Sequence, residues 1–318
     1  MKRSSLITAT GLALGTALIS GFSNFIGKIG VTAVKDPIVF TTLKNAVVAL
    51  LLVGIFITFR KWREMRTLSP RQWLKLAAIG VIGGSVPFAL FFTGLSQTSA
   101  LNASLIHKTL FLWVLLLAIP ILKERLTAWQ WVGIGVVAAA NLFVGGFKGF
   151  KLNGGELMIL AATILWAVEN IIAKIALRDV SSLTVAAARM VFGSIILATF
   201  VTWRGGGSAV MYLTAVQWGW TLLASALLIG YVLTWYAALK RAPATYVATL
   251  LVPATLITNV LSAVFITHAF PLVQLMNASL VAVGAFLLIR FAHQAMSKPT
   301  PGTFTPLEKT TDSGRWYK

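Results

Sequence analysis

The chain has 318 residues, of which 58% are hydrophobic and only 11% are charged. Soluble domains carry roughly 25% charged residues, so this composition indicates a protein that lies in a membrane. Cysteine is absent, which excludes disulfides, thiolate metal sites and cysteine nucleophiles. The formal net charge of +19 is better explained by loop lysines and arginines that set membrane topology than by nucleic-acid binding.

Apolar stretches dominate the chain, and about ten of them are long enough, or nearly so, to cross a bilayer as helices of about 20 residues. The first stretch is too long for the apolar region of a signal peptide, so we interpret it as a retained span. We expect the polar tail 292–318, which contains three prolines, to be disordered and cytoplasmic. The expected spans are 5–27, 37–59, 73–95, 100–121, 127–146, 155–177, 182–203, 216–239, 244–266 and 270–291.

Two segments of the sequence repeat one pattern. Asn24 and Lys28 have the same spacing as Asn170 and Lys174, at a shift of 146 residues. The shift stays nearly constant downstream, which indicates that one half of the chain is a diverged duplicate of the other.

The duplication predicts the architecture. Residues 1–150 would form a first repeat of five spans and residues 151–291 a second, in an all-α membrane protein with ten transmembrane helices. Because five is odd, the second repeat must enter the membrane from the opposite side. Inverted repeats are typical of secondary transporters, with the substrate site at their interface. Gly83-Gly84, Pro87 and Pro253 are candidate helix breaks there, although such residues are common in membrane helices.

Basic residues lie mostly in alternate loops. With the N-terminus inside, 18 lysines and arginines fall in inner segments and 4 in outer segments. This bias follows the positive-inside rule. We therefore expect both termini to be cytoplasmic and the protein to lie in the cell (inner or plasma) membrane.

Six ionisable residues within the expected spans or at their ends are candidates for a transport pathway. Such groups are costly in lipid, so by default they face the interior of the bundle and mark a pathway. The alternative is that their side chains extend to the headgroups, which we favour for the two near span ends, Lys28 and Lys174. Together with Asn24 and Asn170, the candidate pathway residues are Lys28, Lys44, Lys108, Glu169, Lys174 and Arg189.

Glu169 and Arg189 lie at matched depth in consecutive expected spans, which predicts an ion pair between them. The alternative is an unpaired Glu169 that exchanges protons and couples transport to a proton gradient. In the first repeat Ser23 replaces the acid, so Lys44 and Lys108 have no visible partner. This excess of basic groups favours an anionic or zwitterionic substrate.

Four aromatic residues on the same spans are candidates for lining a cavity against a planar substrate. Packing against lipid or within the core is the more common role of such residues. The candidates are Phe22, Trp166, Trp235 and Tyr236.

Several segments together resemble the EamA-type transporters of the drug/metabolite transporter superfamily. They are Ser-Asn-Phe-Ile-Gly-Lys28, Glu-Asn-Ile-Ile-Ala-Lys174, Ile-Leu-Lys-Glu124-Arg-Leu-Thr127 and Ala237-Ala-Leu-Lys240. The resemblance implies a cavity lined mainly by spans 1–4 and 6–9, with spans 5 and 10 peripheral and available for a homodimer. It gives Glu124 a structural or gating role, and His268 stands where the second repeat would have a matching glutamate.

We therefore expect a secondary active transporter that moves a small organic metabolite by alternating access between the repeats. The expected partners are that substrate and the lipid bilayer, with no nucleic acid, no metal and no other cofactor. ATP is not expected as a direct energy source because the sequence has no nucleotide-binding loop. The alternatives are proton-coupled efflux of hydrophobic or cationic drugs, with Glu169 as the exchange site, and more remotely a lipid-modifying membrane enzyme or a scaffold. The enzyme is disfavoured because histidine, aspartate and cysteine are not clustered.

Overall fold

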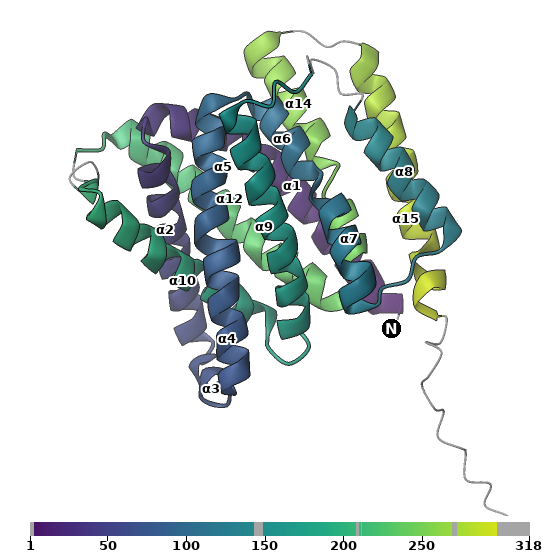
Figure 1. Cartoon of the computed structure of the whole chain (residues 1–318), viewed down its shortest axis with the longest axis horizontal. Helices are drawn as coiled ribbons and strands as arrows, with labels where there is room; N and C mark the ends of the chain where they lie inside the picture. Colours follow the sequence, from purple (N-terminus) through teal and green to yellow (C-terminus); the bar gives the residue numbers. More distant parts are fainter. Residues whose placement is uncertain (1–2, 143–148, 208–209, 211, 269–271, 298–318) are drawn as a thin grey trace, which may run out of the picture.

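A computed structural model of the chain describes residues 3–142, 149–207, 210, 212–268 and 272–297, and the regular elements among them are all helical (Figure 1). The elements are α1 (Arg3–Val34), α2 (Pro37–Thr58), α3 (Trp62–Arg66), α4 (Pro70–Ile79), a π-helical segment η1 (Gly80–Ser85), α5 (Val86–Gln97), α6 (Ala100–Lys108), α7 (Leu110–Leu122), α8 (Ala128–Leu142), α9 (Gly154–Ala176), α10 (Ser182–Trp203), α12 (Ala215–Arg241), α13 (Ala244–Thr249), α14 (Ala254–Ser262), a second π-helical segment η2 (Ala263–Thr267) and α15 (Leu272–Ser297).

Within these residues, nine helical stretches are long and apolar enough to cross a membrane. The expected span 127–146 corresponds to α8, whose described part has 15 residues, and its end falls outside the described residues. The all-α membrane fold is thus confirmed, while the count of ten spans stays a prediction.

The helices begin where the sequence supplies polar caps. The side chain of Asp36 accepts from two main-chain amides at the start of α2, and Ser181 accepts from Thr184 N at the start of α10. Such caps satisfy amides that have no partner within the helix. This explains why most expected bounds lie close to the observed ones.

Both ends of the chain differ from the expected bounds. α1 runs on to Val34 because nothing interrupts it before Lys35, whose φ of +66° ends the helix. α15 continues to Ser297, so the start of the expected disordered tail is helical. The first proline after that span is Pro299, and no earlier residue stops the helix. The tail from residue 298 onward lies outside the described residues.

Three spans are interrupted along their length. In the third, η1 separates α4 from α5, with Pro87 at the start of α5. In the ninth, turns at Leu250–Pro253 separate α13 from α14. The candidate breakers therefore do coincide with breaks. The interruption at Thr109, between α6 and α7, has no glycine or proline and was not expected.

The two halves interlock in an equivalent way. α1 of the first half packs against α12 and α14 of the second, and α9 of the second packs against α5 and α7 of the first. α2 packs against α10, its counterpart in the duplicate. α8 and α15 lie side by side at the edge of the bundle (Figure 1). The central helices therefore meet along one interface between the halves.

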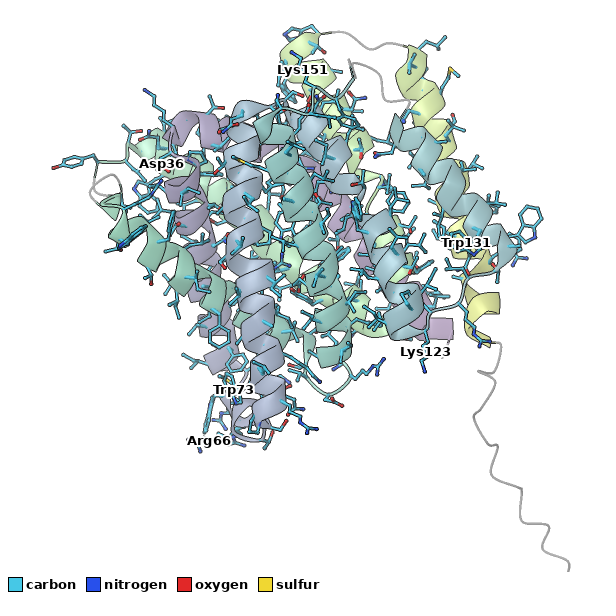
Figure 2. The ribbon with its side chains drawn as sticks, in the orientation of Figure 1. Asp36, Arg66, Trp73, Lys123, Trp131 and Lys151 are labelled. Atoms are coloured by element: carbon cyan, nitrogen blue, oxygen red, sulfur yellow. The ribbon has the colours of Figure 1, made fainter. Side chains whose placement is uncertain are left out.

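Figure 2 shows how the loop residues divide between the two ends of the bundle. Asp36 and Lys151, from expected outer segments, lie at one end, and Arg66 and Lys123, from expected inner segments, lie at the other. This is the two-sided arrangement that the charge pattern requires.

Candidate functional site

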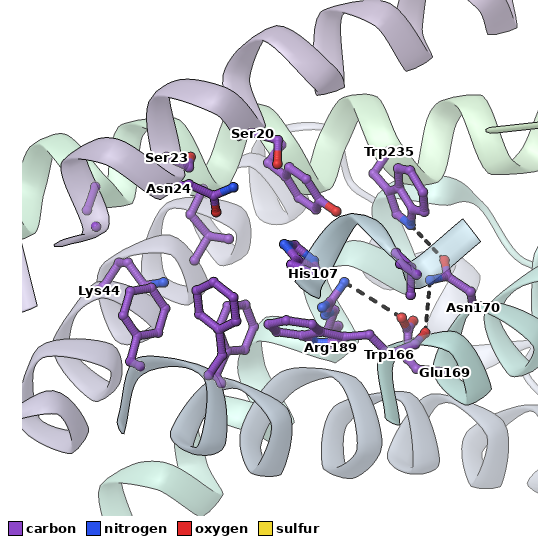
Figure 3. Close-up of a pocket in the computed structure, with 18 residues that line it drawn as sticks. Ser20, Ser23, Asn24, Lys44, His107, Trp166, Glu169, Asn170, Arg189 and Trp235 are labelled. Atoms are coloured by element: carbon purple, nitrogen blue, oxygen red, sulfur yellow. Dashed lines mark hydrogen bonds and ion pairs between the residues drawn. The ribbon is translucent and has the colours of Figure 1, made fainter. Parts of the chain in front are cut away.

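A cavity of about 690 Å³, its mouth included, lies where the two halves meet. Helices from both halves supply its walls (Figure 3). The lining residues are Ser20, Ser23, Asn24, Gly27, Lys44, Phe88, Phe91, Phe92, His107, Leu110, Trp166, Glu169, Asn170, Arg189, Ala224, Leu228, Tyr231 and Trp235.

The α1 wall follows from helical spacing. Ser20, Asn24 and Gly27 are four and three residues apart, so they share one face of the helix, and all three line the cavity. Phe22 falls on the other face because two residues turn an α-helix by about 200°. Its side chain is 39% exposed on the surface of the bundle, so the structure places it away from the cavity.

Glu169 on α9 and Arg189 on α10 come together in the cavity wall, as their matched depth predicted. Arg189 Nη1 lies 3.8 Å from Glu169 Oε2. Tyr236 of α12 joins them: its hydroxyl donates to Glu169 Oε1 at 2.6 Å and accepts from Arg189 Nη1 at 3.1 Å. Tyr236 thus lies behind the wall and holds the pair rather than lining the cavity.

The π-helical segment η1 anchors the same cluster. The Gly83 carbonyl accepts from Arg189 Nε at 3.1 Å and from Trp166 Nε1 at 3.0 Å, and the Gly84 carbonyl accepts from Asn45 Nδ2 at 3.2 Å. A π-helical turn shifts the regular hydrogen-bond register of an α-helix, and such turns are frequent at functional sites. Here it directs main-chain acceptors at side chains of other helices.

Lys44 on α2 occupies the position that Arg189 has in the second repeat, and both line the same cavity. Its Nζ lies 3.9 Å from the ring centre of Phe92 and 4.7 Å from that of Phe88. The residue is 3% exposed. No hydrogen bond or ion pair connects its ammonium to any residue that the structure describes.

Lys108 lies behind the wall. It is 1% exposed, and its Nζ donates to Ser20 Oγ at 2.7 Å. The neighbouring His107 lines the cavity, its ring 5.0 Å from that of Trp166. His107 Nδ1 and Ser23 Oγ are buried and have no hydrogen-bond partner in the described part of the chain.

The two duplicated asparagines both reach the cavity but have different partners. Asn24 Nδ2 donates to Ser104 Oγ at 3.1 Å. Asn170 Oδ1 accepts from Trp235 Nε1 at 2.8 Å, and its Nδ2 donates to the Trp166 carbonyl at 2.9 Å. Trp166 and Trp235, both candidates for lining, do line the cavity.

The two duplicated lysines lie away from the cavity and perform equivalent structural tasks. Lys28 Nζ donates to the carbonyls of Leu95 and Thr98, at 2.8 and 2.7 Å, at the end of α5. Lys174 Nζ donates to those of Leu239 and Ala242, both at 2.6 Å, at the end of α12. Each ammonium caps carbonyls that a helix end leaves free. The ammonium groups of Lys28 and Lys174 therefore bind main-chain carbonyls rather than extend to lipid headgroups.

Glu124 also caps a helix of the other half. Its Oε1 accepts from Ala244 N at 2.6 Å and its Oε2 from Thr245 N at 3.0 Å, at the start of α13. The contact joins the fourth span to the ninth. Pro87 and Pro253, the other two candidates for gating, begin α5 and end the turn before α14 and do not line the cavity.

Two polar contacts to α10 lie at opposite ends of the bundle, one from Asp36 at the start of α2 and one from the short helix α3 that follows α2. In the first, which we name the Asp36 latch, Arg204 Nη2 lies 2.6 Å from both carboxylate oxygens of Asp36. In the second, the Glu64 latch, the Glu64 carboxylate accepts from Ser181 N at 2.7 Å and from Thr184 Oγ1 at 2.9 Å.

The charge state of both latches follows from their partners. Burial raises the pKa of Asp36, but hydrogen bonds from Arg204 and from the amides of α2 outweigh it and hold the pKa below its usual value. Burial likewise raises the pKa of Glu64, and the hydrogen bonds from Ser181 and Thr184 lower it further than burial raises it. Both carboxylates are therefore ionised at neutral pH.

Several lining residues were missed by sequence reasoning. Phe88, Phe91 and Phe92 have the i, i+3, i+4 spacing of one helical face, and Tyr231 lies one turn before Trp235. In a span that is apolar all round, this spacing does not distinguish a cavity from lipid. His107 was not among the candidates, and its position next to Lys108 was the available signal.

Comparisons with known proteins agree with this architecture. An "Uncharacterized transporter YyaM" of Bacillus subtilis is 30% identical over 158 residues, which cover 48% of this chain and 50% of that protein. The match thus spans half of that relative's length. An uncharacterized transporter of Methanothermobacter thermautotrophicus is 21% identical over 285 residues, covering 81% of this chain and 82% of the relative.

A solved structure described only as "Crystal structure of protein" is similar with a TM-score of 0.66 and 17% identity, over 91% of this chain and 99% of that one, which supports the fold alone. The model of the EamA-like transporter family matches residues 7–146 and 153–290, once in each half. The chain is a multi-pass membrane protein and belongs to the EamA-like transporter family.

Proposed function

We propose that the protein is a secondary active transporter that moves a small organic metabolite across the cell membrane by alternating access between its two repeats. The observation that carries the proposal is the cavity between the halves, into which equivalent residues of both repeats project: Asn24 with Asn170, and Lys44 with Arg189. A binding site at the interface of two repeats can be exposed to either side when one repeat moves against the other.

The two latches support this mechanism. The Asp36 latch joins the start of α2 to the end of α10, and the Glu64 latch joins α3, which directly follows α2, to the start of α10. Tilting α2 and α3 together against α10 would therefore open one end while the other stays closed. The Asp36 latch contributes little on its own, since exposed ion pairs are typically worth about 0–1 kcal/mol. That small energy suits contacts that must form and break in each cycle.

Proton-coupled efflux of hydrophobic cations is the second candidate. Glu169 lines the cavity, and its Oε2 has no hydrogen-bond partner among the described residues. Aromatic walls can also attract cations. The nearby Arg189 guanidinium weighs against this candidate, because it would repel a cation from the only acid that lines the described cavity.

Flux in proteoliposomes tests the proposal. The purified chain would be reconstituted, and uptake of a panel of anionic, zwitterionic, neutral and cationic solutes measured with and without a proton gradient. We expect saturable uptake of a subset of the panel, above that of protein-free liposomes. Absence of uptake and of counterflow for the whole panel would contradict the proposal.

The expected topology and assembly belong to the same proposal: both termini in the cytoplasm, and a homodimer through the peripheral helices α8 and α15. Reporter fusions in the 204–208 loop would report an outer location if the topology is right. Light scattering of the detergent-solubilised chain would give its oligomeric state.

A further inference from the structure

We infer that the cavity binds an aromatic monocarboxylate, with the carboxylate on the Lys44 ammonium and the ring between the aromatic walls. This inference rests on the proposed transport function and names the substrate class of the same site. It follows from the charges of the cavity, from its free polar groups and from the placement of its rings.

The charges of the described cavity wall do not balance. Two basic residues, Lys44 and Arg189, face one acid, Glu169. Glu169 lies beside the Arg189 guanidinium and accepts from the Tyr236 hydroxyl, and no described contact joins it to Lys44. A buried charge without a partner is costly. One negative charge of the substrate would supply the missing counter-ion.

Lys44 is the basic group that is free to take this role. Arg189 is held by Gly83 O, Tyr236 and Glu169. Lys108 donates to Ser20 and lies behind the wall. The ammonium of Lys44 lies over the faces of Phe88 and Phe92 and has no hydrogen bond or ion pair with any residue in the described part of the chain. One accessible ammonium fits one carboxylate, which is why we infer a monoanion rather than a dianion.

The other free polar groups fit the same ligand. Ser23 Oγ and His107 Nδ1 line the cavity region without a partner in the described chain. In contrast, the asparagine beside the acid, Asn170, already bonds Trp235 and Trp166. Hydroxyl and imidazole groups can donate to a carboxylate, whereas the one carboxylate in the described wall, Glu169, already lies beside the Arg189 guanidinium, which disfavours the ammonium of a zwitterion or a cation there.

The aromatic rings of the cavity wall indicate the chemistry of the rest of the ligand. The rings of Phe91 and His107 lie 5.3 Å apart, that of Trp166 lies 5.4 Å from Phe91, and Tyr231 stacks on Trp235 at 5.9 Å. All five residues line the cavity. Aromatic rings in such walls favour another ring in offset or edge-to-face contact. The ligand is therefore aromatic rather than aliphatic.

Binding of matched probes to the purified full chain tests the inference. Isothermal titration would compare 2-naphthoate with neutral 2-naphthamide, cationic 2-naphthylmethylammonium and saturated decahydro-2-naphthoate. Because 2-naphthoate can form a charge-assisted hydrogen bond with the ammonium, we expect it to bind roughly ten-fold or more tightly than the neutral amide. Loss of ring stacking should weaken the saturated acid by about three-fold or more.

Lys44→Met should remove the preference for the acid over the amide, and Lys44→Arg should keep it. Lys151→Met, at an exposed lysine, is the control and should bind as the unmodified chain does. If the amide or the ammonium probe binds as tightly as 2-naphthoate, or if Lys44→Met keeps the preference, the inference is overturned.

The wild-type probe series alone decides the question should Lys44→Met fail to fold. The binding experiment and the flux measurement can also fail independently of each other. Flux of other solutes without binding of 2-naphthoate would refute the substrate class and leave transport standing. Binding as described, without flux of any solute including 2-naphthoate, would refute transport and leave the site assignment standing.

Discussion

Three side chains at the centre of the bundle, Glu169, Tyr236 and Arg189, hold three helices together. The 3.8 Å separation of acid and guanidinium is long for a direct hydrogen bond, and the tyrosine hydroxyl at 2.6 Å provides the shorter contact. Glu169 and Arg189 are 0% and 4% exposed. At such burial each charge depends on the other, because neither can be solvated by water.

Glu169→Gln should therefore destabilise the protein, by roughly 3–5 kcal/mol, because it leaves the Arg189 charge buried without its counter-ion. Adding Arg189→Met should restore part of the loss. Thermal unfolding of the detergent-solubilised variants, followed by size-exclusion chromatography, measures both effects. A Glu169→Gln variant as stable as the unmodified chain would show that the carboxyl is not charged in the resting protein.

The Asp36 latch gives a prediction on pH. The pKa of Asp36 is lowered in the folded chain, so its contribution to stability is present above the unfolded value of about 3.9 and is lost as the pH falls through the folded value. Asp36→Asn should therefore cost the same at pH 5 and pH 7.5, below about 1 kcal/mol for so exposed a pair. The cost should vanish only below about pH 4. Melting temperatures of the variant and the unmodified chain at pH 7.5, at pH 5 and below about pH 4 test this. A cost that changes between pH 5 and 7.5 would contradict the prediction.

Sequence reasoning succeeds or fails at this scale for identifiable reasons. Glu169 and Arg189 could be paired because both partners are charged side chains, whose depth can be counted along two spans. The roles of Lys28 and Lys174 could not be predicted, because their partners are carbonyls, which every residue has. Phe22 could be assigned neither to lipid nor to the cavity, since both surroundings accept phenylalanine.

Among the helices, the π-helical segment η1 packs closely against the other half. A methyl group built on Gly84 would overlap the main-chain oxygen of Arg189, and one on Gly83 would lie 2.5 Å from Glu169 Cγ. Main chain cannot move aside as a side chain can. The two glycines thus let η1 approach α10 closely enough for the Gly83 carbonyl to bind Arg189.

Gly84→Ala should be strongly destabilising, by more than about 2 kcal/mol, because α10 would have to shift and the contacts of Arg189 would be lost. Gly54→Ala is the matched control, since a methyl group there meets nothing within 4 Å. It should leave stability unchanged or raise it by up to about 1 kcal/mol through helix propensity. Comparing the melting temperatures of Gly84→Ala and Gly54→Ala tests the close approach of η1 to α10. Equal melting temperatures would contradict it.

The elements themselves were largely predictable from the sequence. Apolar runs between caps such as Asp36 and Ser181 fix the helix bounds, and Gly83-Gly84 and Pro253 coincide with breaks in their spans. The break at Thr109 carries no glycine or proline, so local sequence gave no sign of it. It arises in the packed bundle, where Lys108 reaches Ser20 of α1.

For the molecule as a whole, the duplication has placed two similar sets of contacts at opposite ends of one cavity. The lysine caps at α5 and α12 are nearly identical in both halves. The latches differ: one is an arginine–aspartate pair and the other a carboxylate on a helix start. In the mechanism that we propose, the caps keep each half rigid, while the latches are the contacts that alternate.

Cross-linking of the two latches tests this account most directly. Because the chain has no cysteine, Asp36→Cys with Arg204→Cys, and Glu64→Cys with Thr184→Cys, can each be joined by a short reducible bifunctional thiol reagent. Counterflow of a transported solute would be measured in proteoliposomes before linking, after linking and after reduction, with the single-cysteine variants as controls. We predict that either link alone abolishes counterflow and that reduction restores it. Undiminished counterflow with both ends linked would contradict alternating access between the repeats.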